Sequence, residues 1–133
     1  MFLNKLDTQS KEAFLELSYF VAKSDESFSD IQKSLIEGYT KEMNIENIQF
    51  DEEKFSLENT LKKVINKDYQ KIILMEILAI VYTDSLMHPE EKKIIDTMVD
   101  IWNINSSLVI VYGEWAKNLL SLHIQGDALL DLN

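Results

Sequence analysis

The sequence predicts an all-α fold, a single-domain bundle of six or seven helices built on two related helical hairpins. Only three glycines and one proline occur in 133 residues, which leaves little turn material for a many-stranded sheet. Leu, Ile, Lys and Glu are abundant, and this composition favours helices. The third observation is a repeat, in which residues 14–45 align with residues 73–104. In this alignment Asp25 lies over Asp84, 59 positions later.

Each copy of the repeat is centred on an aspartate at a predicted turn between two helices. The other identical aligned pairs are Leu15 and Leu74, Lys33 and Lys92, Ile36 and Ile95, Asn44 and Asn103, and Ile45 and Ile104. Two copies of one helical hairpin are therefore expected. A duplicated acidic turn predicts either a two-part cation site or a purely structural repeat, and the alignment alone leaves both readings open.

The first hairpin begins at a capping residue. Asp7 or Ser10 can cap the first helix, because a short side-chain acceptor satisfies the free backbone donors at a helix start. Apolar residues such as Phe14, and Val21 seven positions later, then give this helix one buried face. The polar run at residues 23–27 interrupts the pattern. We therefore expect the first helix to end there.

The second helix is predicted from a capping box. Ser29 and Gln32 have the required spacing, in which two side chains satisfy two backbone donors reciprocally. A helix is therefore expected over about residues 30–43. The following segment, residues 44–57, is acidic and irregular in pattern. It contains too many apolar residues for a free linker, so we expect it to pack across the hairpins.

A short helix precedes the second hairpin. Ser56 is its expected cap, and it should end near Asn66. Asp68 is the expected cap of the next helix, which should run over residues 69–83. That helix is apolar on almost every side, which places it at the centre of the bundle.

The second helix of the second hairpin has a clear start. Residues 88–91 read His-Pro-Glu-Glu. Proline suits the first helical position, and carboxylates in the first turn complement the helix dipole. Trp102 in this helix and Trp115 in the next lie at helical positions among aliphatic residues. We interpret both tryptophans as anchors in the core rather than as a ligand cage.

A last helix is expected after a cluster of short polar residues. Its candidate caps are Asn105, Ser106 and Ser107. Residues 108–112 are rich in β-branched side chains, which favour a strand. Apolar residues continue at helical spacing as far as Leu122, and this continuation favours a helix. Residues 124–133 are expected to form a tail.

Composition limits the domain organisation and the function. The length suits one domain over residues 1–133, with its core at about 7–123. The net charge of −10 argues against nucleic acid as a partner, because phosphate binding relies on Lys and Arg. The absence of cysteine excludes disulfides, thiolate metal sites and cysteine catalysis. No secretory signal is visible, and the longest apolar run, residues 72–81, is about half of the roughly 20 residues that a membrane span needs. We therefore expect a cytoplasmic protein that does not insert into a membrane.

The two predicted turns carry a short motif. The first reads AKSDESFSDIQ over residues 22–32, and the second reads VYTDSLMHPEE over residues 81–91. This pattern resembles that of the tellurite-resistance TerB-like family, in which Ala, two variable residues, Asp and Gly are followed by a Glu seven residues after the Asp. The glutamate is kept at Glu91. The residues that depart from the family pattern are Glu26, Ser85 and Gln32. The resemblance implies an all-helical fold and a divalent-cation site in a stress-response setting.

The candidate metal ligands are Asp25, Asp84 and Glu91. Calcium and magnesium, the candidate ions, prefer several oxygen ligands. Further carboxylates lie nearby in the sequence at Glu26, Asp30 and Glu90. If the two hairpins pack with their turns at the same end, these carboxylates form a cluster that a cation neutralises. The alternative is structural: the two aspartates cap helices or close turns, and Gln32 and Glu91 are capping-box residues.

Other chemistry has little support in the sequence. The spacing from Asp84 lacks the alternating ligands and the central glycine of an EF-hand. His88 and His123 have no companion ligands at a spacing that suits zinc. Residues 84–86, Asp-Ser-Leu, match the phosphopantetheine-attachment tripeptide, but they directly follow an apolar helix, so we interpret the match as chance. No nucleophile elbow and no glycine-rich phosphate loop occurs, so no enzymatic activity is expected.

The expected function is therefore non-catalytic. We predict a cytoplasmic TerB-like protein, in a stress response such as tellurite resistance, that binds a divalent cation weakly through its acidic turns, a protein partner, or both. The alternative is a metal-independent acidic interaction module, such as an adaptor or an immunity-type inhibitor, that docks onto a basic protein surface. Docking of that kind weakens as salt is added.

Overall fold

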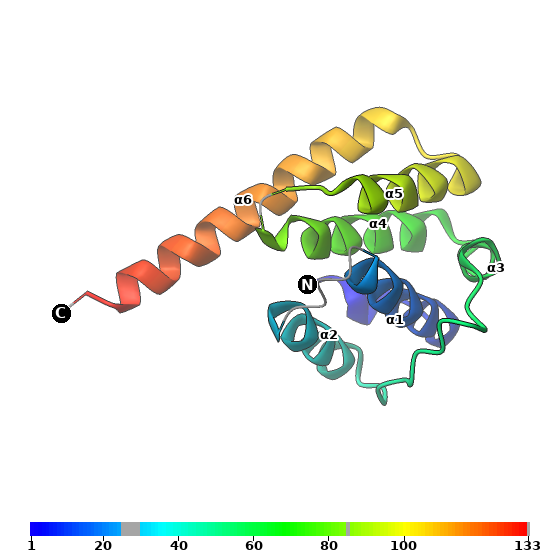
Figure 1. Ribbon diagram of the computed structural model, residues 1–133, viewed down its shortest axis with the longest axis horizontal. Helices are drawn as coiled ribbons and strands as arrows, with labels where there is room; N and C mark the ends of the chain where they lie inside the picture. Colours follow the sequence, from blue (N-terminus) through cyan, green and yellow to red (C-terminus); the bar gives the residue numbers. More distant parts are fainter. Residues whose placement is uncertain (25–29, 85, 133) are drawn as a thin grey trace.

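The computed structural model describes residues 1–24, 30–84 and 86–132, with the exception of the side chain of Asp84. In this part of the chain the regular structure is entirely helical, which confirms the all-α prediction, and it comprises six α-helices and two short 3-10 helices (Figure 1). The elements are η1 (Leu3–Lys5), α1 (Thr8–Lys23), α2 (Asp30–Met43), α3 (Leu57–Lys62), α4 (Lys67–Val81), η2 (Tyr82–Asp84), α5 (Pro89–Trp102) and α6 (Ser106–Leu130).

Helix α4 is at the centre of the bundle. It packs against α1 on one side and against α5 and α6 on the other (Figure 1). Its buried residues are Gln70, Ile73, Leu74, Glu76, Ile77, Leu78, Ile80 and Val81. A helix that is apolar on nearly every side is stable only where neighbours cover all of its faces. The central position that the sequence predicts for this helix follows from that requirement.

A buried carboxylate in α4 fixes the N-terminal segment. Glu76 and Glu42 both bind the Met1 ammonium, at 2.9 and 2.8 Å. The backbone N–H of Leu3 also donates to Glu42, at 2.7 Å. Burial disfavours the charged ammonium, but its hydrogen bonds and its attraction to the two carboxylates outweigh that effect and raise its pKa. Leu3 and Leu6 are consequently buried in the core, which extends closer to the N-terminus than the predicted start near residue 7.

Helix α1 begins at one of its two predicted caps, and α2 has its predicted bounds, whereas Ser29 lies outside the described residues and the capping box of Ser29 and Gln32 stays a prediction. Asp7 caps α1, and its Oδ1 accepts a hydrogen bond from the Ser10 amide at 2.8 Å. Helix α2 spans the predicted residues 30–43. Asn44 then adopts a φ of 55°, a left-handed conformation that asparagine tolerates and that terminates a helix. The Ile45 amide donates back into α2 at 3.2 Å, which fixes the chain as it leaves the helix.

Helix α5 begins at Pro89, as predicted, and ends in the same way as α2. Asn103 has a φ of 52°, and the Ile104 amide donates back into α5 at 3.0 Å. At the last residue of α5, the Trp102 indole N–H donates to the Leu61 carbonyl at 2.8 Å and ties α5 to α3. The first and last residues of α5 each lie 59 positions after those of α2.

The boundary between α3 and α4 differs from the prediction. Helix α3 ends at Lys62, well before Asn66, because Val64 leaves the helical path to enter the core. Asn66 caps α4 in place of Asp68, and its Oδ1 accepts from two backbone amides of the first turn at 2.8 and 3.1 Å. The predicted limits of this helix, residues 69–83, therefore shift toward the N-terminus by about one half-turn.

Helix α6 consists of a part that lies on the bundle and a part that projects from it. Over residues 106–117 it packs on α4 and η2, and Gly113 and Ala116 are buried. Residues 118–130, which we call the arm, extend away from the bundle toward their C-terminal end (Figure 1), although Leu119 and Leu120 are half-buried and His123 lines a hollow with the first turns of α2. The segment that the sequence analysis assigned to a tail is thus helical as far as Leu130. A glycine inside a helix, such as the half-buried Gly126, costs about 1 kcal/mol, and the leucines and alanine around it are strong helix formers that offset this cost.

Candidate functional site

The structure describes only part of the predicted metal site. Asp25 and Glu26 lie outside the described residues. Asp84 ends η2, and its backbone is described but its side chain is not. Glu91 is thus the one predicted ligand whose side-chain geometry can be stated. The clustering of the three carboxylates stays a prediction.

Glu91 is the third residue of α5, and its side chain turns back toward the helix start. Its Oε1 accepts a hydrogen bond from the backbone N–H of His88 at 3.0 Å, and the residue is 1% exposed. This contact is the glutamate half of a capping box. A carboxylate in this position also complements the positive end of the helix dipole. One oxygen of Glu91 is therefore engaged in stabilising the start of α5.

The described carboxylates that flank the predicted metal ligands in the sequence are on the surface. Asp30 is exposed at the first residue of α2. Glu90 is exposed and forms an ion pair with Lys93 at 3.1 Å. Among the described residues no group of three or more His, Asp or Glu side chains is arranged to hold a metal ion. Neither Asp25 nor the Asp84 side chain belongs to the described set.

A second candidate site is the acidic loop, residues 44–56, which joins α2 to α3 and is held against α1 by aromatic rings. Phe50 stacks on Tyr19 of α1 with 6.0 Å between ring centroids, and Phe55 packs on Phe20 of α1 at 4.6 Å. The two loop phenylalanines are themselves 5.3 Å apart. Such ring pairs contribute about 0.5–1.5 kcal/mol each beyond the area that they bury. The prediction that this segment packs rather than hangs free is confirmed.

Hydrogen bonds define the course of the acidic loop further. The Tyr19 hydroxyl donates to Asn47 Oδ1 at 2.8 Å, and the Ile48 amide donates to the same oxygen at 2.9 Å. Farther along, Asp51 Oδ1 accepts from the Glu53 amide at 3.1 Å, which closes a local turn. The acidic loop therefore has a fixed conformation without regular secondary structure.

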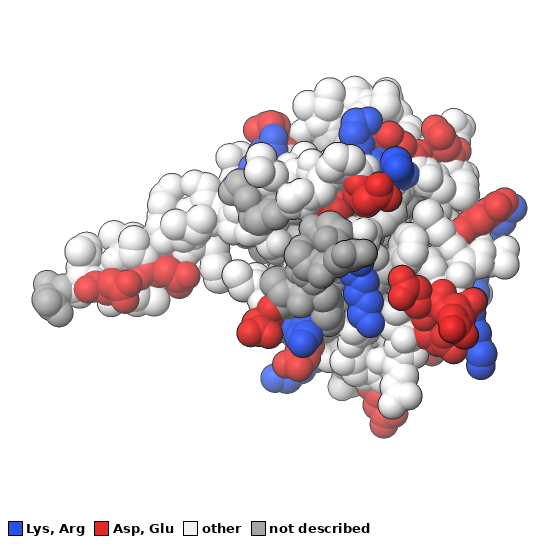
Figure 2. Space-filling model, in the orientation of Figure 1, with Lys and Arg blue, Asp and Glu red and all other residues white. Residues whose placement is uncertain are grey.

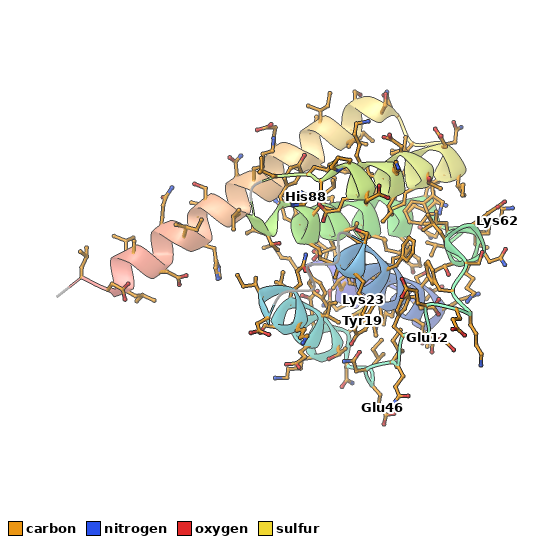
Figure 3. All side chains as sticks on the ribbon, in the orientation of Figure 1. Glu12, Tyr19, Lys23, Glu46, Lys62 and His88 are labelled. Atoms are coloured by element: carbon orange, nitrogen blue, oxygen red, sulfur yellow. The ribbon has the colours of Figure 1, made fainter. Side chains whose placement is uncertain are left out.

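The outer side of the acidic loop is negatively charged. Glu46, Asp51, Glu52 and Glu53 are all exposed. Lys54 is the only lysine of the loop, and its Nζ lies 3.9 Å from Asp51. No lysine of the described chain lies within ion-pair distance of the other three carboxylates. Figure 3 shows Glu46 at the outer edge of the loop, pointing away from the bundle, and Figure 2 shows acidic side chains over this part of the surface.

A hollow between α5 and α6 is the candidate small-molecule site. It has a volume of about 330 Å³ and is lined largely by apolar side chains of the two helices. Its four charged residues form two ion pairs, Lys92 with Asp96 at 3.0 Å and Lys117 with Glu114 at 3.4 Å. The described lining residues do not include a nucleophile beside a general base. This geometry supports no specific reaction.

Comparison of the chain with models of protein families, with curated proteins and with solved structures finds no match. The resemblance to the TerB-like family therefore rests on the motif in the sequence. Among the described helices, α6 included, none combines the length and the apolar character that a membrane span requires.

Proposed function

We propose that this protein is a non-catalytic interaction module that binds a protein partner with a basic surface through the acidic loop. The observation that carries the proposal is the exposure of three carboxylates, Glu46, Glu52 and Glu53, on a loop that ring contacts hold against α1, with no ion-pair partner for them in the described part of the chain. A preorganised loop loses little conformational freedom on binding, so more of the contact energy appears as affinity.

Electrostatics supports a basic partner. The chain has a net charge of −10, and it contains no arginine. Long-range attraction steers a positively charged partner toward such a surface and raises the association rate. Glu46, Glu52 and Glu53, for which the described residues provide no ion-pair partner, then supply the contacts that select lysine or arginine side chains over neutral ones. In the proposed module, the overall negative charge attracts the partner, and the arrangement of the loop carboxylates then selects it.

The test compares two variants with the same change in net charge. One replaces Glu46, Glu52 and Glu53 by glutamine. The control replaces three exposed acidic residues on other elements, through Glu37→Gln, Asp100→Asn and Asp127→Asn. Proteins bound from an extract of the source cells at low salt are identified by mass spectrometry, and binding is repeated with the purified partner. The proposal expects the loop variant alone to lose a salt-sensitive, basic partner. Equal loss in both variants would reduce the effect to net charge and contradict a loop-specific site.

We also propose that α1–α2 and α4–α5 are copies of one TerB-like hairpin. Support comes from the 59-residue offset between the bounds of α2 and α5 and from the matching left-handed asparagines, Asn44 and Asn103, at their ends. Asp7 and Asn66, the caps of α1 and α4, have the same offset. The proposed family would place the module in a stress response such as tellurite resistance.

Weak binding of calcium or magnesium at Asp25, Asp84 and Glu91 is the second candidate function. Its support is the duplicated acidic turn and the TerB-like motif. Thermal unfolding with added metal tests this function, because an ion that binds only the native state raises the midpoint temperature of unfolding.

A further inference from the structure

The arm carries the continuation of an apolar stripe of α6 that lies beside the fully buried Gly113 and Ala116 and is half-buried on the bundle. Seven residues of α6 are spaced alternately by four and three, and we call them the α6 seam. They are Leu108, Tyr112, Trp115, Leu119, Leu122, Gly126 and Leu129. A strict repeat of this kind is typical of a helix that packs against another helix along its length. The seam spans almost all of the 25-residue helix, including the arm.

The bundle covers only the first part of the α6 seam. Leu108, Tyr112 and Trp115 pack against the core. In the arm, by contrast, Leu122 is 64% exposed and Leu129 is 65% exposed. Burying a leucine side chain contributes about 1.5–3 kcal/mol. The arm therefore presents a helical packing face whose burial would release substantial free energy.

No contact in the described part of the chain explains why the seam residue at position 126 is a glycine. Its φ is not positive, and a Cβ atom at this residue would meet no heavy atom within 4 Å. Glycine inside a helix costs about 1 kcal/mol relative to alanine. A side chain from another molecule that approaches the backbone closely would give the glycine a role.

We propose that a second copy of this chain covers the arm, with the two arms antiparallel. In the register that fits the seam, Leu122 of each copy faces Gly126 of the other, and Leu119 of each copy faces Leu129 of the other. Large side chains then meet small ones at the centre, and every exposed seam position is filled. The paired stretch ends before Trp115, so the contact between α6 and the bundle is left in place.

The chemistry of the arm favours a copy of this chain over a lipid surface. Lys117 is the last basic residue of the chain apart from His123, and the only other charged side chains beyond it are Asp127 and Asp131. Helices that lie on membranes carry lysine or arginine on their polar face. A second arm, in contrast, has the same length and the complementary sequence of large and small seam residues. The arrangement also closes with two-fold symmetry, which prevents further growth.

The size of the contact sets its strength. The paired stretch of about 11 residues is roughly 16 Å long. Such a contact is smaller than the about 1,200 Å² that a standard interface buries, so the dimer is weak and reversible. Each chain has a net charge of −10, so two copies repel each other. Salt screens this repulsion, and dimerisation strengthens as salt is added. Docking of the acidic loop onto a basic partner has the opposite salt dependence.

Sedimentation equilibrium over a range of protein concentrations tests the proposal, at about 0.1 M and about 0.5 M salt. The wild-type chain is expected to dimerise, more tightly at the higher salt. Leu122→Glu is expected to weaken the dimer by about 100-fold or more, because both copies lose a seam leucine. Gln125→Glu adds the same charge away from the seam and is expected to dimerise like the wild type. Both side chains are exposed, so circular dichroism should show both variants folded.

Several outcomes would overturn the proposal. A wild-type chain that stays monomeric at all concentrations would do so, and so would equal weakening by Leu122→Glu and Gln125→Glu. Orientation is tested with single-cysteine chains, since the natural chain has no cysteine. An equimolar mixture of Leu122→Cys and Gly126→Cys chains is expected to form mainly the mixed disulfide. Like-with-like disulfides would contradict the antiparallel register. Binding of the arm to neutral phospholipid vesicles without dimerisation would assign it to lipid instead.

Discussion

The two parts of α6 share one periodic pattern and differ in what surrounds them. Leu108, Tyr112 and Trp115 of the α6 seam pack against the core, whereas Leu122 and Leu129 in the arm are largely exposed. The spacing of apolar residues is the same in both parts. The spacing therefore identifies which face of a helix can pack, and the rest of the fold determines whether other residues of the same chain bury that face. The predictions below probe this difference, from the largest expected effect to the smallest.

A matched pair of alanines should separate the two parts of α6 most strongly. Ala116 is 2% exposed on the bundle, and Ala128 is exposed on the arm. Ala116→Glu places an unpaired carboxylate in the core and should lower the free energy of unfolding by at least about 3 kcal/mol. Ala128→Glu should change it by less than about 0.5 kcal/mol. Urea denaturation measures both values. Similar losses would mean that the arm is packed.

The two tryptophans offer a second, smaller contrast. Trp102→Phe removes the indole N–H that binds the Leu61 carbonyl, which keeps its hydrogen bond from the Val64 amide. The lost hydrogen bond and the smaller ring should cost about 1–2 kcal/mol. Trp115, at the edge of the bundle, packs its ring 6.2 Å from that of Phe2 and should lose less than 1 kcal/mol or so as Trp115→Phe. Chemical denaturation measures both losses. A larger loss from Trp115→Phe than from Trp102→Phe would mean that the edge of the bundle is the more rigid region.

Helix ends extend the comparison to about 1 kcal/mol. Asp7→Ala removes the cap of α1 and should lower the free energy of unfolding by about 1 kcal/mol. Two controls should lower it less, because Asp7→Ser keeps a capping oxygen and Asp131→Ala lies at the end of the arm. Hydrogen bonds from Ser10 hold the pKa of the Asp7 carboxyl below its usual value. The cap therefore stabilises the fold above the unfolded pKa and loses its effect as the pH falls through the folded one. The difference between wild type and Asp7→Ala should accordingly shrink in acid, and a difference that grows would contradict the assignment.

The smallest expected effect concerns the hairpin turns. Calcium or magnesium at a concentration equal to its dissociation constant should raise the free energy of unfolding by only about 0.4 kcal/mol. Asp84→Ala should abolish the rise, and Asp100→Ala, on the exposed side of α5, should preserve it. A thermal titration after chelator treatment measures the shift. No rise at millimolar metal would leave Glu91 with its capping role and remove the cation from the proposed functions.

Local signals in the sequence predicted much of the fold. Helix α2 ends where it was expected because Asn44 readily adopts the left-handed conformation that stops a helix. The predicted start of α4 was wrong because Asn66 and Asp68 are both good caps two residues apart. Which of them caps the helix depends on Val64 entering the core. The burial of Leu3 could not be predicted, since it depends on Glu42 and Glu76 from distant helices.

The candidate sites were less accessible from the sequence. The acidity of residues 51–53 was visible, and so was the apolar content of the segment around them. The stacking of Phe50 on Tyr19 could not be predicted, because the two rings come from elements about 30 residues apart and no local pattern connects them. The capping contact of Glu91 was one of two readings that its position allowed. A local pattern suggests what a carboxylate can do, while the packing around it selects among those roles.

Amide hydrogen exchange along α6, measured at low and at high protein concentration, tests the contrast between its two parts most directly. Residues 106–117 should be protected at both concentrations, because the bundle covers them. Residues 118–130 should exchange rapidly in the dilute protein and become protected as copies associate. Uniform protection of the whole helix in the dilute protein would contradict the account, and so would an arm that gains no protection at any concentration.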